Sequence, residues 1–180
     1  MKKNICVFCG SRKGLNLEWE QRAQDLGQAI ALRKDTLIFG GGGGGLMGVI
    51  AKAAIIKGGD VIGIIPKTLV KKEPVLEQLS KVHYVESMSE RKDLMKEMSD
   101  VFIIIPGGVG TLDELFDVWA TKQTGYHHKQ IIIANWSDYY HDLIKFFDHS
   151  ILSGLMTKEH LDSINFASSI EDIFHAIDTY

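Results

Sequence analysis

The sequence has no surplus of positive charge and no long apolar run. Its 180 residues carry 20 Lys and Arg against 23 Asp and Glu, so the formal net charge is -3. A basic surface for nucleic acid is therefore not expected. No apolar run approaches the roughly 20 residues of a membrane-spanning helix, so we expect no membrane partner. The apolar segment at residues 5–9 is too short for the core of a signal peptide, which favours a cytoplasmic protein.

Cysteine is scarce: the only two residues of this type are Cys6 and Cys9, spaced as C-x-x-C. A zinc site of the usual kind needs about four ligands, and there is no second cysteine pair. A redox C-x-x-C normally opens a helix, whereas this pair lies in a segment that predicts the first strand. The favoured interpretation is two small side chains that pack around a strand end.

Several catalytic motifs are also absent. Neither glycine-rich loop is followed by Gly-Lys-Ser or Gly-Lys-Thr, which disfavours a P-loop kinase or nucleotide triphosphatase. The sequence has no H-E-x-x-H and no G-x-S-x-G, so a zinc peptidase and an α/β-hydrolase are not indicated. It offers no obvious set of metal ligands, and we expect neither a metal nor a cofactor.

What the sequence does contain is a regular alternation of apolar and amphipathic segments. Strands are predicted at residues 4–8, 36–39, 61–65, 82–85, 101–105, 130–134 and 164–166. Helices are predicted at residues 17–33, 46–56, 87–98, 139–151 and 170–177, with another that begins after Thr111. Strands that are apolar throughout are typical of a parallel sheet covered on both faces. We therefore predict one doubly wound, Rossmann-like α/β domain over residues 1–180.

The most informative stretch is residues 101–114. A buried strand ends at Pro106, three glycines follow in four residues, and Thr111 is a predicted N-cap of the next helix. Such a turn directs free backbone amides and the positive end of a helix dipole at one point, which favours an anion such as phosphate. Asp113 and Glu114 are expected in the first helical turn. The spacing from Thr111 to Glu114 also fits a capping box, so Glu114 is either a helix cap or a catalytic carboxylate.

A second glycine-rich loop runs from Gly40 to Gly45 and contains the dinucleotide pattern Gly43-x-Gly45-x-x-Gly48. It follows the second predicted strand and lacks the downstream acid that would hold a ribose. The loop could contact a phosphate, bind a dinucleotide or simply allow close backbone packing. Both glycine loops and the Gly10-Ser11 pair lie at carboxyl ends of predicted strands, so we expect them to converge on one pocket.

Arg91 and Lys92 lie on a predicted helix before the central strand. In the run Ser-Glu-Arg-Lys-Asp they could form a solvated charged surface. Alternatively, a guanidinium could bind a phosphate or carboxylate with two parallel hydrogen bonds.

Five blocks in order resemble the LOG ("lonely guy") family, once labelled possible lysine decarboxylases. They are the opening strand with Gly10-Ser11, the glycine loop through Gly48, the Gly58 to Pro66 segment, Met88-Ser89-Glu90-Arg91-Lys92, and the signature Pro106-Gly107-Gly108-Val109-Gly110-Thr111-Leu112-Asp113-Glu114. The resemblance implies a homodimeric phosphoribohydrolase that cleaves a cytokinin riboside 5'-monophosphate or AMP into free base and ribose 5-phosphate.

The resemblance also implies roles for individual residues. Arg91 and Glu114 match the catalytic pair of the family. The implied substrate contacts are Glu73, Arg91, Lys92, Gly107, Gly108, Val109, Gly110, Thr111, Leu112 and Asp113, and we add Ser11, Gly42 and Gly43 from the other loops. The chain departs from many members at Ala120-Thr121.

Glycosidic cleavage builds positive charge on the ribose, which a carboxylate can stabilise, and Glu114 is the expected group. A non-catalytic nucleotide carrier on the same fold, with Glu114 as a helix cap, is the main alternative. A lysine decarboxylase is a weaker one, because no lysine lies in a context that suggests a pyridoxal phosphate site.

Overall fold

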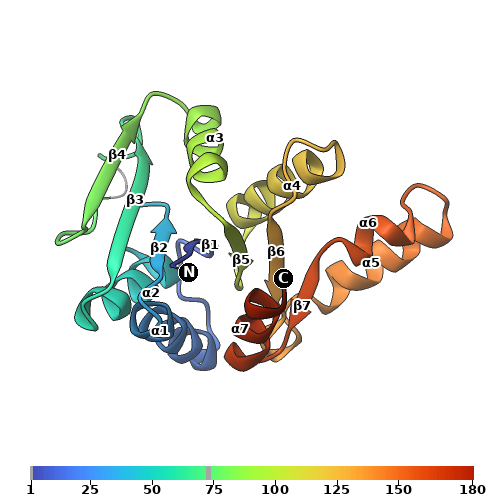
Figure 1. Cartoon of the computed structure of the whole chain (residues 1–180), viewed down its shortest axis with the longest axis horizontal. Coiled ribbons are helices and arrows are strands. Elements are labelled where there is room, and N and C mark those ends of the chain that lie inside the picture. Colours follow the sequence, from blue (N-terminus) through green and yellow to red (C-terminus); the bar gives the residue numbers. More distant parts are fainter. Residues whose placement is uncertain (1, 72–73) are drawn as a thin grey trace.

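The structure is a computed structural model that describes residues 2–71 and 74–180. Its centre is one seven-stranded sheet in which every strand pair is parallel (Figure 1). The strand order is β4-β3-β2-β1-β5-β6-β7. The strands are β1 (Asn4–Phe8), β2 (Thr36–Phe39), β3 (Asp60–Pro66), β4 (Lys81–Val85), β5 (Val101–Ile104), β6 (Gln130–Ala134) and β7 (Asn165–Ala167). The predicted parallel α/β fold is confirmed.

Helices cover the sheet on two faces because the buried strands present apolar side chains to both sides. The helices are α1 (Leu17–Leu32), α2 (Gly45–Ile56), α3 (Met88–Met98), α4 (Val109–Gln123), α5 (His141–Leu152), α6 (Lys158–Asp162) and α7 (Ile170–Thr179). α1, α2 and α7 pack on one face with Ile5, Val7 and Ile103, whereas α3, α4 and α5 pack on the other with Cys6 and Phe102. α5 and α6 extend beyond the sheet beside β7 (Figure 1).

The order of the strands reverses direction between β1 and β5. From β1 the chain builds outward through β2, β3 and β4, and then returns to place β5 on the other side of β1. The two central strands are in register from Ile5 with Val101 to Phe8 with Ile104, so they end together. Such a switch point leaves a crevice at the carboxyl ends of the strands, which is where ligands bind in open α/β sheets.

The largest correction to the prediction is at the signature stretch. β5 ends at Ile104, and α4 begins at Val109 with Gly108 as its N-cap. Thr111 is therefore inside the first turn and is not the cap. Asp113 and Glu114 accordingly lie beyond the first turn, which contains no acidic residue. The Gly108 carbonyl accepts the first hydrogen bond of the helix, from the Leu112 amide at 3.1 Å, but glycine has no side chain to accept from the amides of the first turn.

Smaller differences lie toward the C-terminus. A 3₁₀ turn (Trp136–Asp138) precedes α5, and the polar segment before the last strand contains α6. The predicted strand at residues 164–166 lies at Asn165–Ala167. Across residues 2–71 and 74–180, no helix is both long and apolar enough to cross a membrane.

Candidate active site

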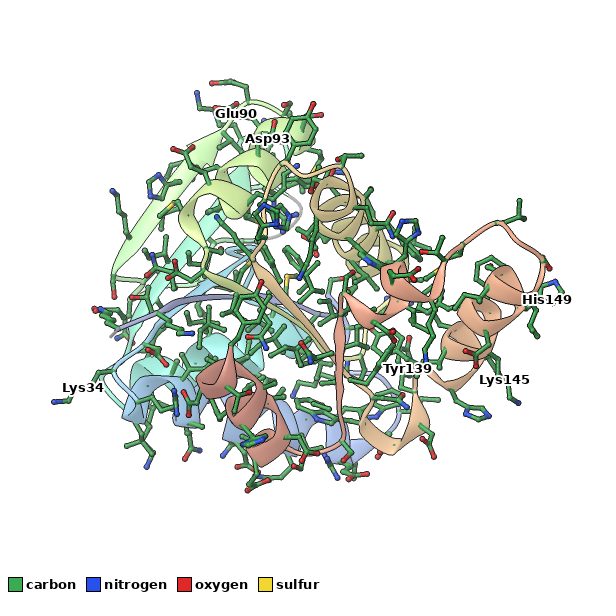
Figure 2. The ribbon with its side chains drawn as sticks, turned by 45° about the vertical axis from the view of Figure 1, so that its right-hand side comes forward. Lys34, Glu90, Asp93, Tyr139, Lys145 and His149 are labelled. Carbon is green, nitrogen blue, oxygen red and sulfur yellow. The ribbon has the colours of Figure 1, made fainter. Side chains whose placement is uncertain are left out.

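A buried ion pair joins α3 to α4 at the switch point. Nη1 of Arg91 lies 2.6 Å from Oε1 of Glu114, although the two residues are 23 positions apart. Arg91 is 8% exposed and Glu114 is 7% exposed. The interpretation of Arg91 as part of a solvated surface is therefore wrong. A solvated surface is nevertheless formed by two neighbours of Arg91 on α3, since Glu90 and Asp93 are exposed and point outward (Figure 2).

The guanidinium is held by the sheet as well as by the carboxylate. Nε of Arg91 donates to the carbonyl oxygen of Ile64 on β3 at 3.1 Å. Gly40, directly after β2, leaves room for it, because a Cβ atom built there would lie 2.4 Å from Nη2. The first glycine of the Gly40–Gly45 loop thus makes space for Arg91, which fixes the guanidinium in one orientation.

The surroundings of Glu114 act on its charge in opposite directions. Burial raises the pKa of Glu114 above its ordinary value of 4.5, and the charge and hydrogen bond of Arg91 oppose that shift. The net direction is upward. Glu114 is therefore a buried carboxylate whose charge is stabilised by one guanidinium, and it does not cap its helix. The capping-box interpretation of Thr111 and Glu114 is wrong.

Glu114 and Arg91 line a cleft with a volume of about 230 Å³. The three loops predicted to converge do meet here: Gly10 and Ser11 after β1, Gly40 after β2, and residues 108–111 after β5. The loops are tied to one another, since the Gly10 amide donates to the Pro106 carbonyl and the Leu46 amide donates to the Gly10 carbonyl. Both glycine loops are therefore held against the Gly10-Ser11 segment, which lies between them.

One wall of the cleft is the N-terminus of α4. No side chain caps this helix, so amides of its first turn remain available to a ligand. Gly107 is required in the turn, because a Cβ atom there would lie 2.1 Å from Oγ1 of Thr111. The lining also includes the apolar side chains of Met47, Leu69 and Met88. The cleft thus combines an anion-binding end, a buried carboxylate and an apolar surface.

Lys92 and Asp113 form a second, outer ion pair between the same two helices. Nζ of Lys92 lies 3.0 Å from Oδ1 of Asp113 and 3.6 Å from Asp117. The Asp113 side chain is 52% exposed. Burial lowers the pKa of Lys92, but the aspartates outweigh it and the pKa is raised. Neither residue lines the cleft as the structure describes it.

Other predicted residues lie away from the cleft. Leu112, on α4, is partly buried and packs against the hydrophobic core. Gly42 forms an isolated bridge with Val75, and Gly43 faces two hollows on the far side of its loop. Glu73 lies outside the described residues. Cys9 lines the cleft, where burial raises the pKa of its thiol, and Cys6 is buried in the core; both are free thiols, as the packing interpretation predicted.

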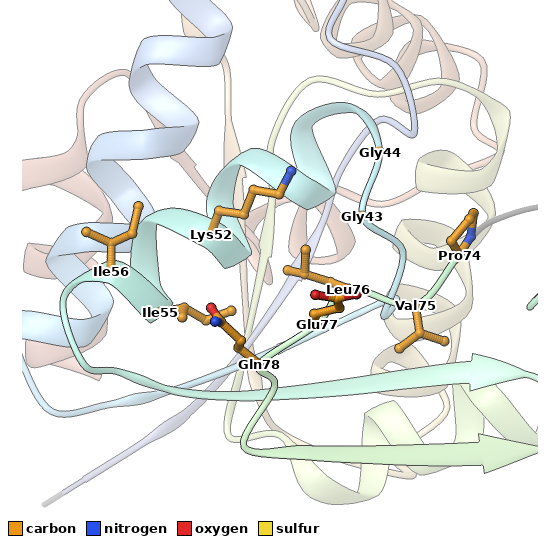
Figure 3. A pocket seen from close by; sticks show the side chains of 10 residues that line it. All are labelled: Gly43, Gly44, Lys52, Ile55, Ile56, Pro74, Val75, Leu76, Glu77 and Gln78. Carbon is orange, nitrogen blue, oxygen red and sulfur yellow. The ribbon is translucent and has the colours of Figure 1, made fainter.

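A larger hollow, of about 630 Å³, lies apart from the ion pair. It lies between α2 and residues 74–78, behind Gly43 and Gly44 (Figure 3). Its described lining is mainly apolar, with Ile55, Ile56 and Leu76, and with Lys52 at its edge. The smaller cleft is the better candidate for an active site, because a buried carboxylate, a buried guanidinium and a helix N-terminus meet there.

Two residues that the sequence did not indicate also contact the signature turn. Tyr140 donates its hydroxyl to the Ile105 carbonyl at 2.9 Å, and Tyr139 donates to the Gly107 carbonyl at 2.6 Å. The sequence placed Tyr140 only on the apolar side of a helix. No local pattern marks a tyrosine that bonds to backbone more than 30 residues away.

Fold and cleft together define the class: a Rossmann-like α/β protein with an anion-binding turn at its switch point and a buried carboxylate beside it. Comparison with known proteins is specific. The family model described as possible lysine decarboxylase matches residues 47–177. The cytokinin riboside 5'-monophosphate phosphoribohydrolase of Rhodococcoides fascians is 37% identical over 176 residues, which cover 97% of this chain and 89% of that protein. An enzyme of the same name from Arabidopsis thaliana is 38% identical, covering 99% and 83%.

Solved structures agree on the fold. A molybdenum cofactor binding protein from Rippkaea orientalis superposes with a TM-score of 0.74 at 25% identity, covering 99% of this chain and 97% of that one. The molybdenum cofactor carrier protein of Chlamydomonas reinhardtii also gives 0.74, at 21% identity and with 99% and 98% coverage. The chain belongs to the LOG family.

Proposed function

We propose that this protein hydrolyses the N-glycosidic bond of a cytokinin riboside 5'-monophosphate and releases the free base and ribose 5-phosphate. The observation that carries the proposal is the buried Arg91–Glu114 pair beside an uncapped helix N-terminus in one cleft. The phosphoribohydrolases that share 37–38% of its sequence support it. We extend the proposal to AMP, which shares the ribose phosphate and the adenine ring.

The 5'-phosphate binds at the amides of Gly108 to Thr111, where the dipole of α4 favours an anion. That contact is remote from the bond that breaks, so its binding energy can hold the ribose in a reactive geometry. Met47, Leu69 and Met88 offer the base an apolar surface. In this arrangement Ser11 borders the phosphate end of the cleft, and Lys92 and Asp113 act from outside it.

Glu114 acts on the anomeric carbon. As the glycosidic bond lengthens, positive charge develops on the ribose, and the carboxylate stabilises it or takes a proton from the attacking water. The water oxygen bonds to C1', the bond from C1' to the base nitrogen breaks, and the base leaves with a proton. Arg91 keeps Glu114 ionised and oriented through Oε1. We assign both as catalytic residues.

The test is to incubate purified protein with a cytokinin riboside 5'-monophosphate or AMP and to detect free base by chromatography. We expect release from the nucleotides and much less from the matching nucleosides, which lack the phosphate. Tight binding without any release would support the alternative function, a carrier. That alternative has some support, because proteins described as binding or carrying the molybdenum cofactor have this fold.

We also propose that the protein is a homodimer that meets its second copy through α4 and α5. Large apolar side chains gather there without cover in the single chain: Phe116 is 40% exposed, Phe146 59%, Leu152 87% and Leu155 88%. A patch of this kind is typical of an interface. Light scattering should give a mass near twice the 20.1 kDa of one chain, and the mass of one chain would contradict the proposal.

A further inference from the structure

The connection between β6 and α5 holds the signature turn by its carbonyl groups. Tyr140 donates to the Ile105 carbonyl at 2.9 Å and Tyr139 to the Gly107 carbonyl at 2.6 Å. Between them, the Pro106 carbonyl accepts the Gly10 amide at 3.1 Å. Three successive carbonyls of the turn therefore each have their own donor, and two of the donors are tyrosine hydroxyls.

Fixing a carbonyl also fixes the amide that follows it. In a trans peptide, the C=O of one residue and the N–H of the next lie in one plane and point in opposite directions. The described residues contain no cis peptide bond. The bond from Tyr139 to the Gly107 carbonyl therefore sets the direction of the Gly108 amide. Gly108 is the N-cap of α4 and borders the cleft.

The turn needs such an external support. Glycine has more backbone freedom than any other residue, and Gly107 and Gly108 are adjacent with no side chains to pack. Unsupported, their amides would have to be ordered each time an anion binds, which would weaken binding. Carbonyl groups held from behind keep the amides oriented before the ligand arrives.

The tyrosines are themselves rigidly placed. Tyr140 is 3% exposed, and its amide donates to Oδ1 of Asn135 at 2.7 Å. Burial raises the pKa of Tyr140, so its hydroxyl remains a donor at neutral pH. The Tyr139 ring lies edge-on against Trp19 of α1 at 4.9 Å and against Tyr140 at 4.8 Å. Figure 2 shows Tyr139 at the base of α5, far from Lys145 and His149.

The 3₁₀ turn before Tyr139 contains two strained backbone positions, which its contacts with the rest of the protein hold in place. Ser137 and Asp138 have φ of 51° and 55°, which is uncommon for residues other than glycine. Oγ of Ser137 donates to Oε2 of Glu18 at 2.5 Å, and Asn16 donates to the same hydroxyl at 3.2 Å. This turn is thereby tied to the start of α1, and it delivers Tyr139 to the signature loop.

We propose that Tyr139 and Tyr140 are positioning residues for the phosphate-binding turn. The Tyr139 hydroxyl holds the Gly107 carbonyl, so that the Gly108 amide at the start of α4 faces the 5'-phosphate. The Tyr140 hydroxyl holds the Ile105 carbonyl and so anchors the beginning of the turn, although the next residue, Pro106, has no amide hydrogen to orient. The identity of the ligand rests on the proposed function, whereas the hydrogen bonds do not. Neither tyrosine touches the reacting atoms, so neither is a catalytic residue.

The test compares Tyr139→Phe and Tyr140→Phe with Tyr126→Phe. Tyr126 is 84% exposed and lies just after α4, so its variant is a matched control for loss of a phenol hydroxyl. Calorimetry gives the affinity for ribose 5-phosphate, and competition kinetics gives the affinity for adenosine, which lacks the phosphate. Steady-state kinetics with AMP separates KM from kcat, and thermal melting reports folding.

We expect each of the two variants to bind ribose 5-phosphate about tenfold more weakly than the control, because the turn that has lost one hydrogen bond must be ordered when the ligand binds, and the net contribution of one hydrogen bond is on this scale. Adenosine should bind equally to all three. KM for AMP should rise more than kcat falls. Should Tyr140→Phe not fold, Tyr139→Phe decides, because Tyr139 is 39% exposed and its loss disturbs the core little.

The proposal is overturned if the variants bind ribose 5-phosphate as tightly as the control. It is also overturned if adenosine weakens by the same factor, or if the wild type does not bind ribose 5-phosphate. If the wild type releases no base but the ribose 5-phosphate affinities differ as expected, the proposed function fails and the positioning role stands.

Discussion

Among the ion pairs that join α3 to α4, two lie side by side in the sequence but differ sharply in burial. Arg91 pairs with Glu114, and the next residue, Lys92, pairs with Asp113. The inner pair is more than nine-tenths buried, whereas half of the Asp113 side chain meets solvent. Consecutive residues on one helix point in different directions, so one pair faces the cleft and the other faces water.

This difference shows how burial, rather than the ion pair itself, changes the energetics of two charged groups. An exposed pair contributes little, because water and salt screen it and ordering two side chains costs entropy. A buried pair costs desolvation, and it persists when each charge has good partners. The inner pair meets that condition through the Ile64 carbonyl and the space beside Gly40. Charged groups that are buried at a high desolvation cost are found more often at functional sites than elsewhere.

Removing one carboxylate from each pair should give the largest difference between them. We expect Glu114→Gln to reduce turnover of AMP by about 10²- to 10⁴-fold, the usual contribution of a positioned acid or base. Asp113→Asn, the matched change one residue earlier, should cost about tenfold or less, because Asp113 is outside the cleft. The measurement is kcat with chromatographic detection of adenine.

Binding provides the control for that experiment. Glu114→Gln should still bind AMP by calorimetry, since its amide retains an oxygen that can accept from Arg91. Equal losses of turnover in the two variants would contradict the distinction between inner and outer pairs.

How much of this could be predicted from the sequence depends on the range of the interactions. The bounds of β1, β2 and β6 were predicted correctly, because a buried strand of a parallel sheet is apolar at every position. The convergence of three loops followed from topology alone. The start of α4 was missed, because a glycine run looks like a break although glycine serves well as an N-cap.

The site was harder to predict, because its contacts are long-range. Arg91 lies in a run of charged residues that is typical of a solvent-facing helix, and only Ile64 and Glu114 distinguish it from its neighbours. The family resemblance, rather than spacing, named Arg91 and Glu114 as a pair; spacing favoured a helix cap. Tyr139 and Tyr140 had no local signal at all, since their partners lie more than 30 residues earlier.

The acidic limb of the pH profile should report the ionisation of Glu114. Burial raises the pKa of Glu114 above 4.5, and Arg91 opposes it. In the proposed mechanism the ionised carboxylate is the reactive form, so kcat/KM should fall on the acidic side with a midpoint above 4.5. The folded state then holds this proton more strongly than the unfolded chain, so ionising Glu114 lowers the free energy of unfolding as pH rises through that range.

The outer pair should move that midpoint in two directions. Asp113 raises the pKa of Glu114 and Lys92 lowers it. Asp113→Asn should therefore shift the acidic limb to lower pH, and Lys92→Gln should shift it to higher pH. The measurement is kcat/KM for AMP from pH 4 to 8. Shifts of the same sign in both variants would show that the limb does not report Glu114.

The smallest expected effect is the contribution of the outer pair to stability. A double-mutant cycle with Lys92→Gln and Asp113→Asn should give a coupling of about 0.2–1 kcal/mol by urea unfolding. It should largely vanish in about 1 M NaCl, where the Debye length is near 3 Å. Lys145 and Asp142, which lie 4.0 Å apart on the exposed side of α5, provide a control pair with no measurable coupling. A coupling above about 2 kcal/mol that persists in salt would mean that Lys92 and Asp113 are desolvated in solution, as Arg91 and Glu114 are. Exposure would then no longer separate the two pairs, and only their position relative to the cleft would.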